Sequence, residues 1–199
     1  MRNATLLLLA ATIGLSACGG RDEAPPSGNS AAPAGSLSDN AMVNMASNAM
    51  TGPGAEASLQ TAQGTPAGMA RVTESGGALR VSLTVEGLPP GEHGVHIHMT
   101  GKCEAPGFES AGSHWNPSGK KHGLESPQGQ HAGDMPNLIV GEDGHGTVDY
   151  VLKGGTLAEL LDTDGAAFVV HAARDDQKTD PSGDSGGRIA CGVFHATPG

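Results

Sequence analysis

Histidine is concentrated in one stretch of this chain, residues 93–134, which reads HGVHIHMTGKCEAPGFESAGSHWNPSGKKHGLESPQGQHAGD. The stretch holds six of the nine histidines in 42 residues. Near its start, His96 and His98 flank Ile97 in an alternating run. Residues two apart on a β-strand share one face about 7 Å apart, so both imidazoles can reach one ion while Ile97 points into a core. The stretch is too poor in hydrophobic residues for packing to explain its histidines.

A second set of polar residues follows in a loop that is rich in Gly, Pro and Lys. His114, His122, His131 and Asp134 are spaced eight, nine and three residues apart. Three imidazoles and a carboxylate can form the closed tetrahedral set that zinc prefers. A lone histidine is more often an ordinary core or surface residue, but this many in one polar stretch predict metal binding.

Residues 1–17 predict a lipoprotein signal peptide. Arg2 gives a positive start, and the apolar run at 5–15 is too short to span a bilayer. The sequence LSAC at 15–18 is similar to the lipobox of bacterial lipoproteins, which predicts lipid on Cys18 and attachment to a membrane. Gly19, in place of an aspartate, favours the outer membrane, so we expect a location on the periplasmic side of the cell envelope. The alternative is an ordinary cleaved signal with an incidental cysteine.

Residues 18–55 are expected to be a flexible tether. They are mainly Ala, Gly, Ser, Asn and Pro, and so cannot bury enough apolar surface to offset the cost of ordering. Met42, Met45 and Met50 lie within this segment. Their thioethers can bind Cu(I), or they can be incidental, and we favour the second interpretation.

Residues 56–199 have the composition of a folded β domain. Apolar and polar residues alternate at 79–85, which predicts a strand with one buried and one solvated face. Further short strands are expected at 138–140, 147–152, 166–171 and 189–194, and one helical turn at 157–161. Short strands between Gly- and Pro-rich turns predict an antiparallel sandwich or barrel.

The cysteines fit an exported protein. If Cys18 carries lipid, Cys103 and Cys191 remain as an even pair in an oxidising compartment, where they can form a disulfide. Metal ligation by these two thiols is the alternative, although the lack of a CxxC pair argues against it.

The formal net charge of −10, from 21 acidic and 11 basic residues, argues against nucleic-acid binding. A local field can still differ in sign from the global charge, because a cleft focuses it. The cations that lie near the histidine-rich parts of the sequence are Lys102, Lys120, Lys121, Lys178 and Arg188.

Five motifs together resemble those of the bacterial copper,zinc superoxide dismutases in a lipoprotein form. They are GLPPGEHGVHIH at 87–98, SAGSHWNPSGKKHG at 110–123, HAGDMPNL at 131–138, VVHAARDD at 169–176 and PSGDSGGRIACGV at 181–193. The resemblance implies an all-β fold, an eight-stranded antiparallel Greek-key β-sandwich or barrel with long metal-binding and electrostatic loops. It also implies dismutation of superoxide to dioxygen and hydrogen peroxide, which would protect the cell envelope.

The resemblance implies a role for each matching residue. Copper would be bound by His96, His98, His114 and His171, and zinc by His114, His122, His131 and Asp134, so His114 would bridge the two ions. Asp175 would bond to His96 and His122 and couple the sites. Arg188 would receive the superoxide anion beside copper. His114 would supply a proton to the peroxide as copper cycles between its oxidation states. His93 matches a structural histidine that links loops.

Two residues depart from the family pattern. Met99 replaces a polar residue after the second copper ligand, and Asp184 replaces an asparagine near Arg188. Two other functions are alternatives: a non-catalytic surface lipoprotein that stores or delivers copper or zinc, and a zinc hydrolase. Non-catalytic relatives typically lack copper ligands or the arginine, and a hydrolase needs an open zinc position. We therefore expect a dismutase; its relatives include monomers and dimers, so a homodimer is one of two expected states.

Overall fold

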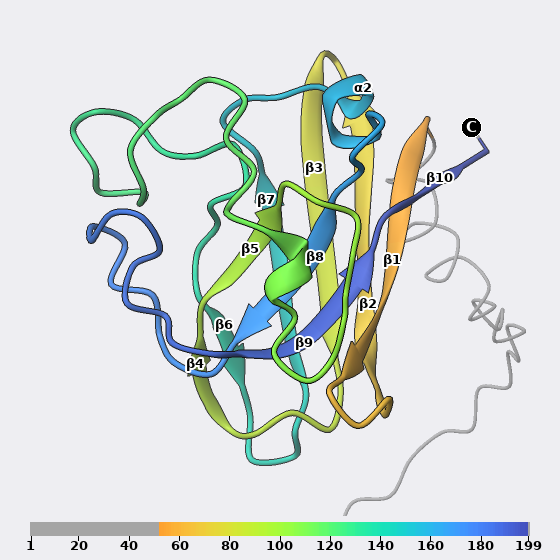
Figure 1. Ribbon diagram of the computed structural model, residues 1–199, viewed down its shortest axis with the longest axis vertical. Coiled ribbons are helices and arrows are strands. Elements are labelled where there is room, and N and C mark those ends of the chain that lie inside the picture. Colours follow the sequence, from red (N-terminus) through yellow and green to blue (C-terminus); the bar gives the residue numbers. More distant parts are fainter. Residues whose placement is uncertain (1–51, 199) are drawn as a thin grey trace, which may run out of the picture. The chain divides into compact units, whose positions relative to one another are not determined.

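The computed structural model describes residues 52–198. The expected signal peptide, Cys18 and the three methionines of the tether lie outside the described residues. Ten strands form one antiparallel sheet (Figure 1), which confirms the all-β prediction. The elements are β1 (Gly54–Thr61), β2 (Pro66–Ser75), β3 (Ala78–Val85), β4 (Gly91–His93), β5 (Val95–His98), η2 (Glu109–Ala111), β6 (Leu138–Val140), β7 (Gly146–Val151), α2 (Leu157–Leu160), β8 (Ala167–His171), β9 (Arg188–Val193) and β10 (His195–Thr197).

The described residues have ten strands rather than eight because single residues interrupt two longer strands. Gly94 separates β4 from β5, and its N–H donates to the carbonyl of Ala173 at 2.8 Å. Phe194 separates β9 from β10 and donates to Ala166 at 3.0 Å. β9 and β10 both pair with β1, so they are one strand interrupted at Phe194. β4 pairs with β6 and β5 with β8, so the partner changes at Gly94.

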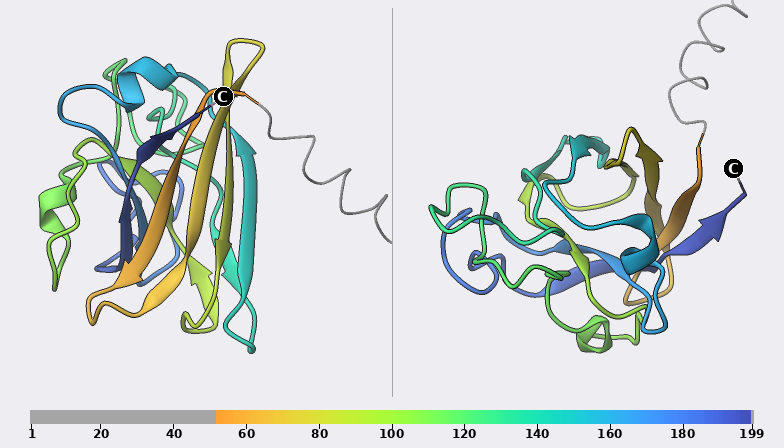
Figure 2. Two further views of the ribbon diagram at one scale, coloured as in Figure 1. Left: turned by 90° about the vertical axis from the view of Figure 1, so that its right-hand side faces the viewer. Right: turned by 90° about the horizontal axis from the view of Figure 1, so that it is seen from above.

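The strand order is β4-β6-β7-β3-β2-β1-β9-β8-β5, with β10 beside β1. β4 and β5 are consecutive in the chain but lie at the two ends of this order, so the sheet closes almost completely into a barrel. The view from above in Figure 2 shows the strands arranged around one interior. The connections from β3 to β4 and from β7 to β8 join strands that are not neighbours, as in a Greek key.

Alternation of apolar and polar residues explains most of the strands. In β3, every second residue from Leu79 to Val85 is buried, as the sequence predicted. β1 and β2 are absent from the predicted strands, because their buried faces are built largely from alanines such as Ala55 and Ala57. β1 begins at Gly54, two residues before the predicted domain boundary. The one-turn helix α2 is capped by Thr156, whose side chain accepts from the N–H of Glu159.

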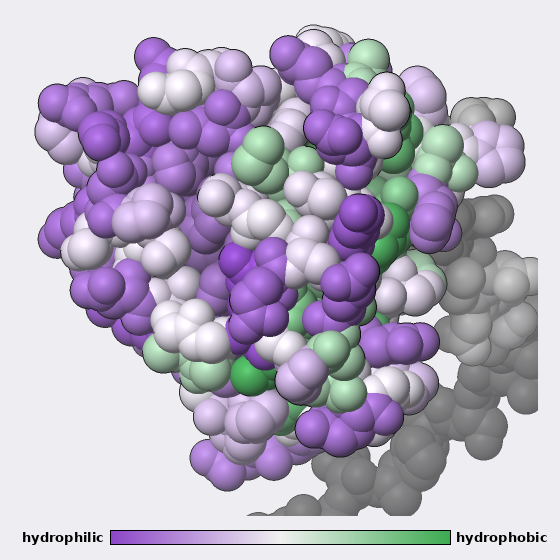
Figure 3. All heavy atoms as spheres, in the orientation of Figure 1, coloured by the Kyte–Doolittle hydropathy of each residue, from purple (hydrophilic) through white to green (hydrophobic). Residues whose placement is uncertain are grey.

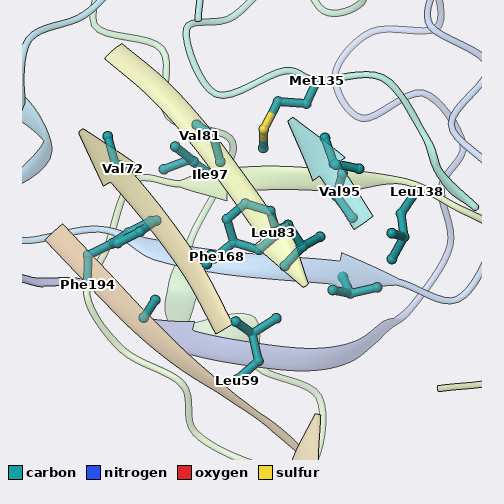
Figure 4. Packing of buried hydrophobic residues seen from close by; sticks show 14 of the residues in the cluster. Leu59, Val72, Val81, Leu83, Val95, Ile97, Met135, Leu138, Phe168 and Phe194 are labelled. Atoms are coloured by element: carbon teal, nitrogen blue, oxygen red, sulfur yellow. The ribbon is translucent and has the colours of Figure 1, made fainter. Parts of the chain in front are cut away.

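The main core is centred on strand β8, in which every residue is buried. Phe168 and Val170 point into the barrel, where Figure 4 shows Phe168 near Leu83. Ala167 and Val169 point to the other side and form a second cluster with Phe108 and Cys191. The loop that follows β5 is therefore packed onto the outside of the barrel.

A disulfide joins this loop to β9. Cys103 and Cys191 are bonded across a sequence separation of 88 residues, with their Cα atoms 5.7 Å apart. The prediction of a disulfide is confirmed, and the alternative of metal ligation by these thiols is excluded.

Two long segments, 99–137 and 172–187, connect the strands. In Figure 1 the later part of the first and the whole of the second lie on the left side, while the η2 turn lies in front of β8 and β9. The same side is mainly hydrophilic in Figure 3. Within residues 52–198, none of the helices has the length and apolar character needed to cross a membrane.

Candidate metal centre

Strand β5 presents two histidines on the face opposite the core. Val95 and Ile97 are in the main core, whereas His96 and His98 are buried on the other face beneath the long loops. On one edge β5 pairs with β8, with Val95 opposite Val170, which brings the end of β8 to the site. This pairing delivers a histidine that is distant in sequence.

The histidine-rich loop is pinned to the other edge of β5. The main-chain N–H of Trp115 donates to the carbonyl of Ile97 at 2.8 Å, and the main-chain N–H of Ile97 donates to the carbonyl of Gly133 at 3.0 Å. Isolated bridges place His98 beside His114 and His96 beside Asp134. The two halves of the loop thus continue the sheet and set their polar side chains against those of β5.

Four buried histidines form the first group of potential metal ligands: His96, His98, His114 and His171. In three of them, one ring nitrogen lies close to an oxygen: His96 Nε2 to Asp175 Oδ2 at 2.7 Å, His98 Nδ1 to Gly112 O at 2.9 Å, and His171 Nδ1 to Gly186 O at 3.2 Å. Carboxylate and carbonyl oxygens only accept, so these nitrogens carry the protons. The other nitrogen of each ring is left with a free lone pair, which a metal ion needs.

The free nitrogens of this group face one another. The Nε2 atoms of His98 and His171 are 3.4 Å apart. His96 Nδ1 and His114 Nε2 are buried and have no hydrogen-bond partner among the described residues. Orphaned buried nitrogens are costly, and a copper ion bound by imidazoles would satisfy them.

The second group surrounds one oxygen, Oδ1 of Asp134. His114 Nδ1, His122 Nδ1 and His131 Nδ1 lie 3.0, 3.1 and 3.4 Å from it. Ligands about 2.0–2.1 Å from a tetrahedral zinc ion are about 3.3–3.4 Å from one another, so these separations fit zinc. Oδ2 of the same carboxylate accepts the main-chain N–H groups of Gly123 and His131 at 2.9 and 3.0 Å, which fixes its orientation.

His96 also lies within 4.8 Å of His114, His122 and Asp134, in a group that does not include His131. However, His96 Nε2 donates to Asp175, and its remaining nitrogen also belongs to the first group. His131 Nδ1 is 3.5 Å from His114 Nδ1 as well as close to Asp134. The geometry around the carboxylate therefore favours His131 over His96 for the fourth position.

His114 belongs both to the group of four histidines and to the group around Oδ1 of Asp134. Its Nδ1 faces Asp134, while its buried Nε2 has no hydrogen-bond partner among residues 52–198. Its ring is stacked on that of His96, with the centroids 3.9 Å apart. Because neither ring nitrogen is used by a main-chain carbonyl, both are available to ions.

Asp175 connects the two groups from behind. Its Oδ2 faces His96 Nε2 at 2.7 Å and its Oδ1 faces His122 Nε2 at 3.1 Å. Sequence reasoning missed two residues that hold it, Asn137 and Gln177. The side chain of Asn137 makes two bonds to the main chain of Asp175, at 2.8 and 2.9 Å, and Gln177 donates its N–H to Oδ1 at 2.6 Å. Asn137 lies within the motif at 131–138, which was the one available signal.

Burial and hydrogen bonding shift the pKa values in opposite directions. Burial lowers the pKa of His96 to about 3 and that of His171 to about 4, which keeps both imidazoles neutral. Burial also acts to lower the pKa of His122, but hydrogen bonds to Asp134 and Asp175 outweigh it and raise the value to about 9. Burial acts to raise the pKa of Asp134, yet the surrounding histidines hold it far below the usual range, so it is a carboxylate.

Arg188 lines a cleft that leads to the first group. The cleft has a volume of about 220 Å³ and is lined by His98, Ser113, His114, His171, Pro181, Ser182, Gly186 and Arg188. Arg188 opens β9, and its guanidinium donates to the carbonyls of Phe108 and Gly112. The cleft thus contains one fixed cation beside the free nitrogens.

Two of the lysines that the sequence places near the histidine-rich segments are paired with carboxylates. Lys121 pairs with Asp180 and Lys178 with Glu125, each at 2.8 Å. None of the four lysines lines the cleft. The local positive field at the cleft therefore depends mainly on Arg188.

The remaining residues singled out by the sequence lie outside the two groups. His93 is buried and links segments, with Nδ1 2.8 Å from His171 O and Nε2 2.9 Å from Pro89 O. Asp184 is exposed at a left-handed position, φ 51°, which aspartate and asparagine tolerate better than most residues. Met99 is half exposed and does not line the cleft.

Comparison with known proteins places these features in one family. The model of the family described as copper/zinc superoxide dismutase (SODC) matches residues 66–194, more than half of the chain. A protein named superoxide dismutase [Cu-Zn] 2 from Aquifex aeolicus is 43% identical over 146 residues, covering 70% of this chain and 85% of its own length. Superoxide dismutase [Cu-Zn] from Caulobacter vibrioides is 41% identical over 147 residues, covering 70% and 84%.

Solved structures agree with the fold. A SOD-like protein from Bacillus subtilis has a crystal structure that matches with a TM-score of 0.62 and 40% identity, over 69% of this chain and 96% of that one. A double mutant of a Bacillus subtilis SOD-like protein matches with a TM-score of 0.62 and 43% identity, over 69% and 95%.

Proposed function

The chain belongs to the copper/zinc superoxide dismutase family, and we propose that it uses a bridged two-metal site to dismutate superoxide in the cell envelope. In this proposal copper is bound by His96, His98, His114 and His171, and zinc by His114, His122, His131 and Asp134. The observation that carries it is the ring of His114, whose Nδ1 faces the proposed zinc group while its buried Nε2 has no hydrogen-bond partner in the described part of the chain.

The overall reaction consumes two superoxide anions and two protons and yields one dioxygen and one hydrogen peroxide. Bound copper supplies the electron transfer, because imidazole ligands suit both of its common oxidation states. His114 holds a proton at Nε2 in one half of the cycle and gives it to the peroxide in the other. Asp134 contacts Nδ1 on the opposite side of that ring and is itself contacted by His122, so the proton is presented in one direction.

Arg188 has a separate role in this proposal. Its guanidinium lines the cleft beside His98 and His114, where it attracts the substrate anion and holds it near the ligand nitrogens. The contacts with two main-chain carbonyls keep it there. A fixed cation in a narrow cleft can act this way even in a protein with a net charge of −10.

A non-catalytic copper- or zinc-binding lipoprotein is the alternative, and one relative is named only superoxide dismutase-like protein YojM, at 43% identity over 143 residues. Against this alternative, all four nitrogens of the first group and the arginine of the cleft are present together. A zinc hydrolase is disfavoured because the second group already offers four ligands.

The proposal is tested on protein purified from its own periplasm. We expect metal analysis to find about one copper and one zinc per chain, consistent with one group of each kind. The same sample should dismutate superoxide, and His98→Ala should not. Bound metals without dismutation in the wild type would favour the storage alternative.

The envelope location rests on the box at residues 15–18. Mass spectrometry of the mature protein should find acyl chains on Cys18 as the first residue. Cys18→Ser should remain folded, uncleaved at this site and without the acyl mass. An unmodified N-terminus at another residue of the wild type would rule out the anchor.

A further inference from the structure

The turn that follows Asp175 is tied to the zinc group by one exposed carboxylate. We propose that Asp180 is a positioning residue, which holds the main chain of His122 and the wall of the cleft in a fixed relation. The inference rests on the proposed function, since it assumes that His122 binds zinc and that the cleft admits the anion.

Asp180 makes two contacts with consecutive residues of the histidine-rich loop. Its Oδ1 accepts the main-chain N–H of His122 at 2.9 Å, and its Oδ2 accepts from Lys121 Nζ at 2.8 Å. His122 is fully buried, and both of its ring nitrogens are already directed at carboxylates. The bond from Asp180 therefore adds a third attachment, on the backbone, to a ring whose position decides zinc binding.

The other side of this link is the cleft. Pro181 and Ser182, the next two residues after Asp180, line it together with Arg188. The turn is internally bonded, because Asp176 accepts the N–H groups of Lys178 and Thr179 at 2.9 and 2.8 Å. Such a turn moves as a unit, so its attachment at Asp180 also sets the position of the cleft wall.

The two contacts of Asp180 differ in what they contribute. The ion pair with Lys121 is exposed, with side-chain exposures of 56% and 39%, and pairs of this kind contribute little. The bond to His122 fixes a metal-binding residue, and removing such outer partners commonly weakens metal affinity about 10–100-fold. Asp180→Asn keeps a neutral oxygen that can accept from the N–H of His122, so it should preserve zinc affinity. Asp180→Ala has no acceptor and should not.

The same two loops supply a matched control. Glu125 and Lys178 form a second ion pair between them, also at 2.8 Å, with exposures of 65% and 60%. No hydrogen bond joins the Glu125 side chain to a predicted ligand in the described part of the chain. Glu125→Ala removes an ion pair between the same segments and leaves the backbone of His122 untouched.

The experiment compares the wild type with Asp180→Ala, Asp180→Asn and Glu125→Ala as full chains loaded with copper and zinc. Zinc affinity is measured by competition with a chromogenic chelator. Azide is titrated against the visible absorption of Cu(II), which reports on the cleft independently of turnover. We expect all three variants to fold, because Asp180 and Glu125 are exposed.

Asp180→Ala should lower the affinity for zinc at least about tenfold and the affinity for azide several-fold. Both affinities of Asp180→Asn and Glu125→Ala should stay within about twofold of the wild type. Unchanged zinc affinity in Asp180→Ala would overturn the inference. So would an equal loss in Asp180→Asn, which would assign the effect to charge, or in Glu125→Ala, which would make it non-specific. A wild type that binds no zinc would instead refute the proposed function, together with this inference.

Discussion

Arg188 and His98 donate to the same acceptor, the carbonyl oxygen of Gly112, at 2.7 and 2.9 Å. One peptide group thus fixes the guanidinium proposed to bind the anion relative to a ring of the proposed copper site. Gly112 has a φ of +75°, and a Cβ there would lie 3.0 Å from Thr100 Oγ1, so a side chain would disturb both bonds.

Arg188→Ala should lower kcat/KM between several-fold and about a hundredfold while both metals stay bound. A unit charge about 5 Å from an anion is worth roughly 3 kcal/mol at an effective dielectric of about 20, and solvent in the cleft reduces this value. Stopped-flow or pulsed generation of superoxide gives the rate, and metal analysis provides the control.

The dependence of the rate on salt distinguishes attraction of superoxide by Arg188 from a purely structural role of this residue. The wild type should slow as ionic strength rises, because screening weakens the local field, and Arg188→Glu should flatten or reverse this slope. A glutamate variant with both metals, full activity and the wild-type salt slope would show that the arginine is only structural.

His122→Ala should lose zinc first, with copper and activity disturbed as a consequence. His98→Ala should abolish dismutation and leave zinc in place, because His98 has no contact with Asp134 in the described structure. The metal content of each variant, after dialysis against equal chelator, tests the two assignments. Equal loss of both metals from both variants would mean that the two groups are assigned wrongly.

Asp175→Asn should lower the affinity for both metals by about 10–100-fold. The carboxylate accepts from His96 with one oxygen and from His122 with the other, whereas an amide has only one oxygen. Asp176→Asn is the matched control. Asp176 is the next residue and its carboxylate bonds only within its own turn, to Lys178 and Thr179. Chelator competition should separate the two variants, and similar affinities would deny Asp175 its coupling role.

Replacing both Cys103 and Cys191 by serine should lower the free energy of unfolding by about 4 to 5 kcal/mol, if chain entropy is the main contribution of this bond. Activity should fall as well, because Phe108 lies in the clamped loop and its carbonyl accepts from Arg188. Urea unfolding and kcat/KM measure the two effects. A stable variant whose kcat/KM is unchanged would show that packing of Phe108 alone holds the arginine.

The metal-free protein should be most stable near pH 6.5. The folded-state pKa values of His96 and His171, lowered by burial to about 3 and about 4, mean that the unfolded chain binds more protons below the ordinary value of 6.5. Stability from these residues is therefore lost as pH falls from 6.5 toward those values, by about 1.4 kcal/mol for each unit of pKa difference.

His122 has the opposite effect in the metal-free protein. Although burial acts to lower its pKa, hydrogen bonds to Asp134 and Asp175 raise it to about 9, so its contribution is complete below 6.5 and lost as pH rises through 9. Urea unfolding between pH 4 and 9, without metals, measures both limbs. Stability that increases on acidification would contradict the buried neutral state of His96 and His171.

The sequence by itself determined the class of fold and most of the chemistry. Alternation at 79–85, short strands between turns and the pair Cys103 and Cys191 were enough to predict an antiparallel β domain with one disulfide. Motifs in a fixed order pointed to the family. These features are local, because the side-chain period of a strand and the spacing of residues in a loop can be read from neighbouring positions.

Only the tertiary structure decided how distant residues meet. His171, Asp175 and Arg188 reach the site because β8 pairs with β5 and β9 pairs with β8, and no local period encodes which strands become neighbours. Tertiary packing also determined which nitrogen of each ring is free and which lysines are neutralised by ion pairs. It brought Asn137 and Gln177 to Asp175, and Asp180 to the main-chain N–H of His122. These are hydrogen bonds between segments far apart in sequence, and their partners exist only once the barrel has closed.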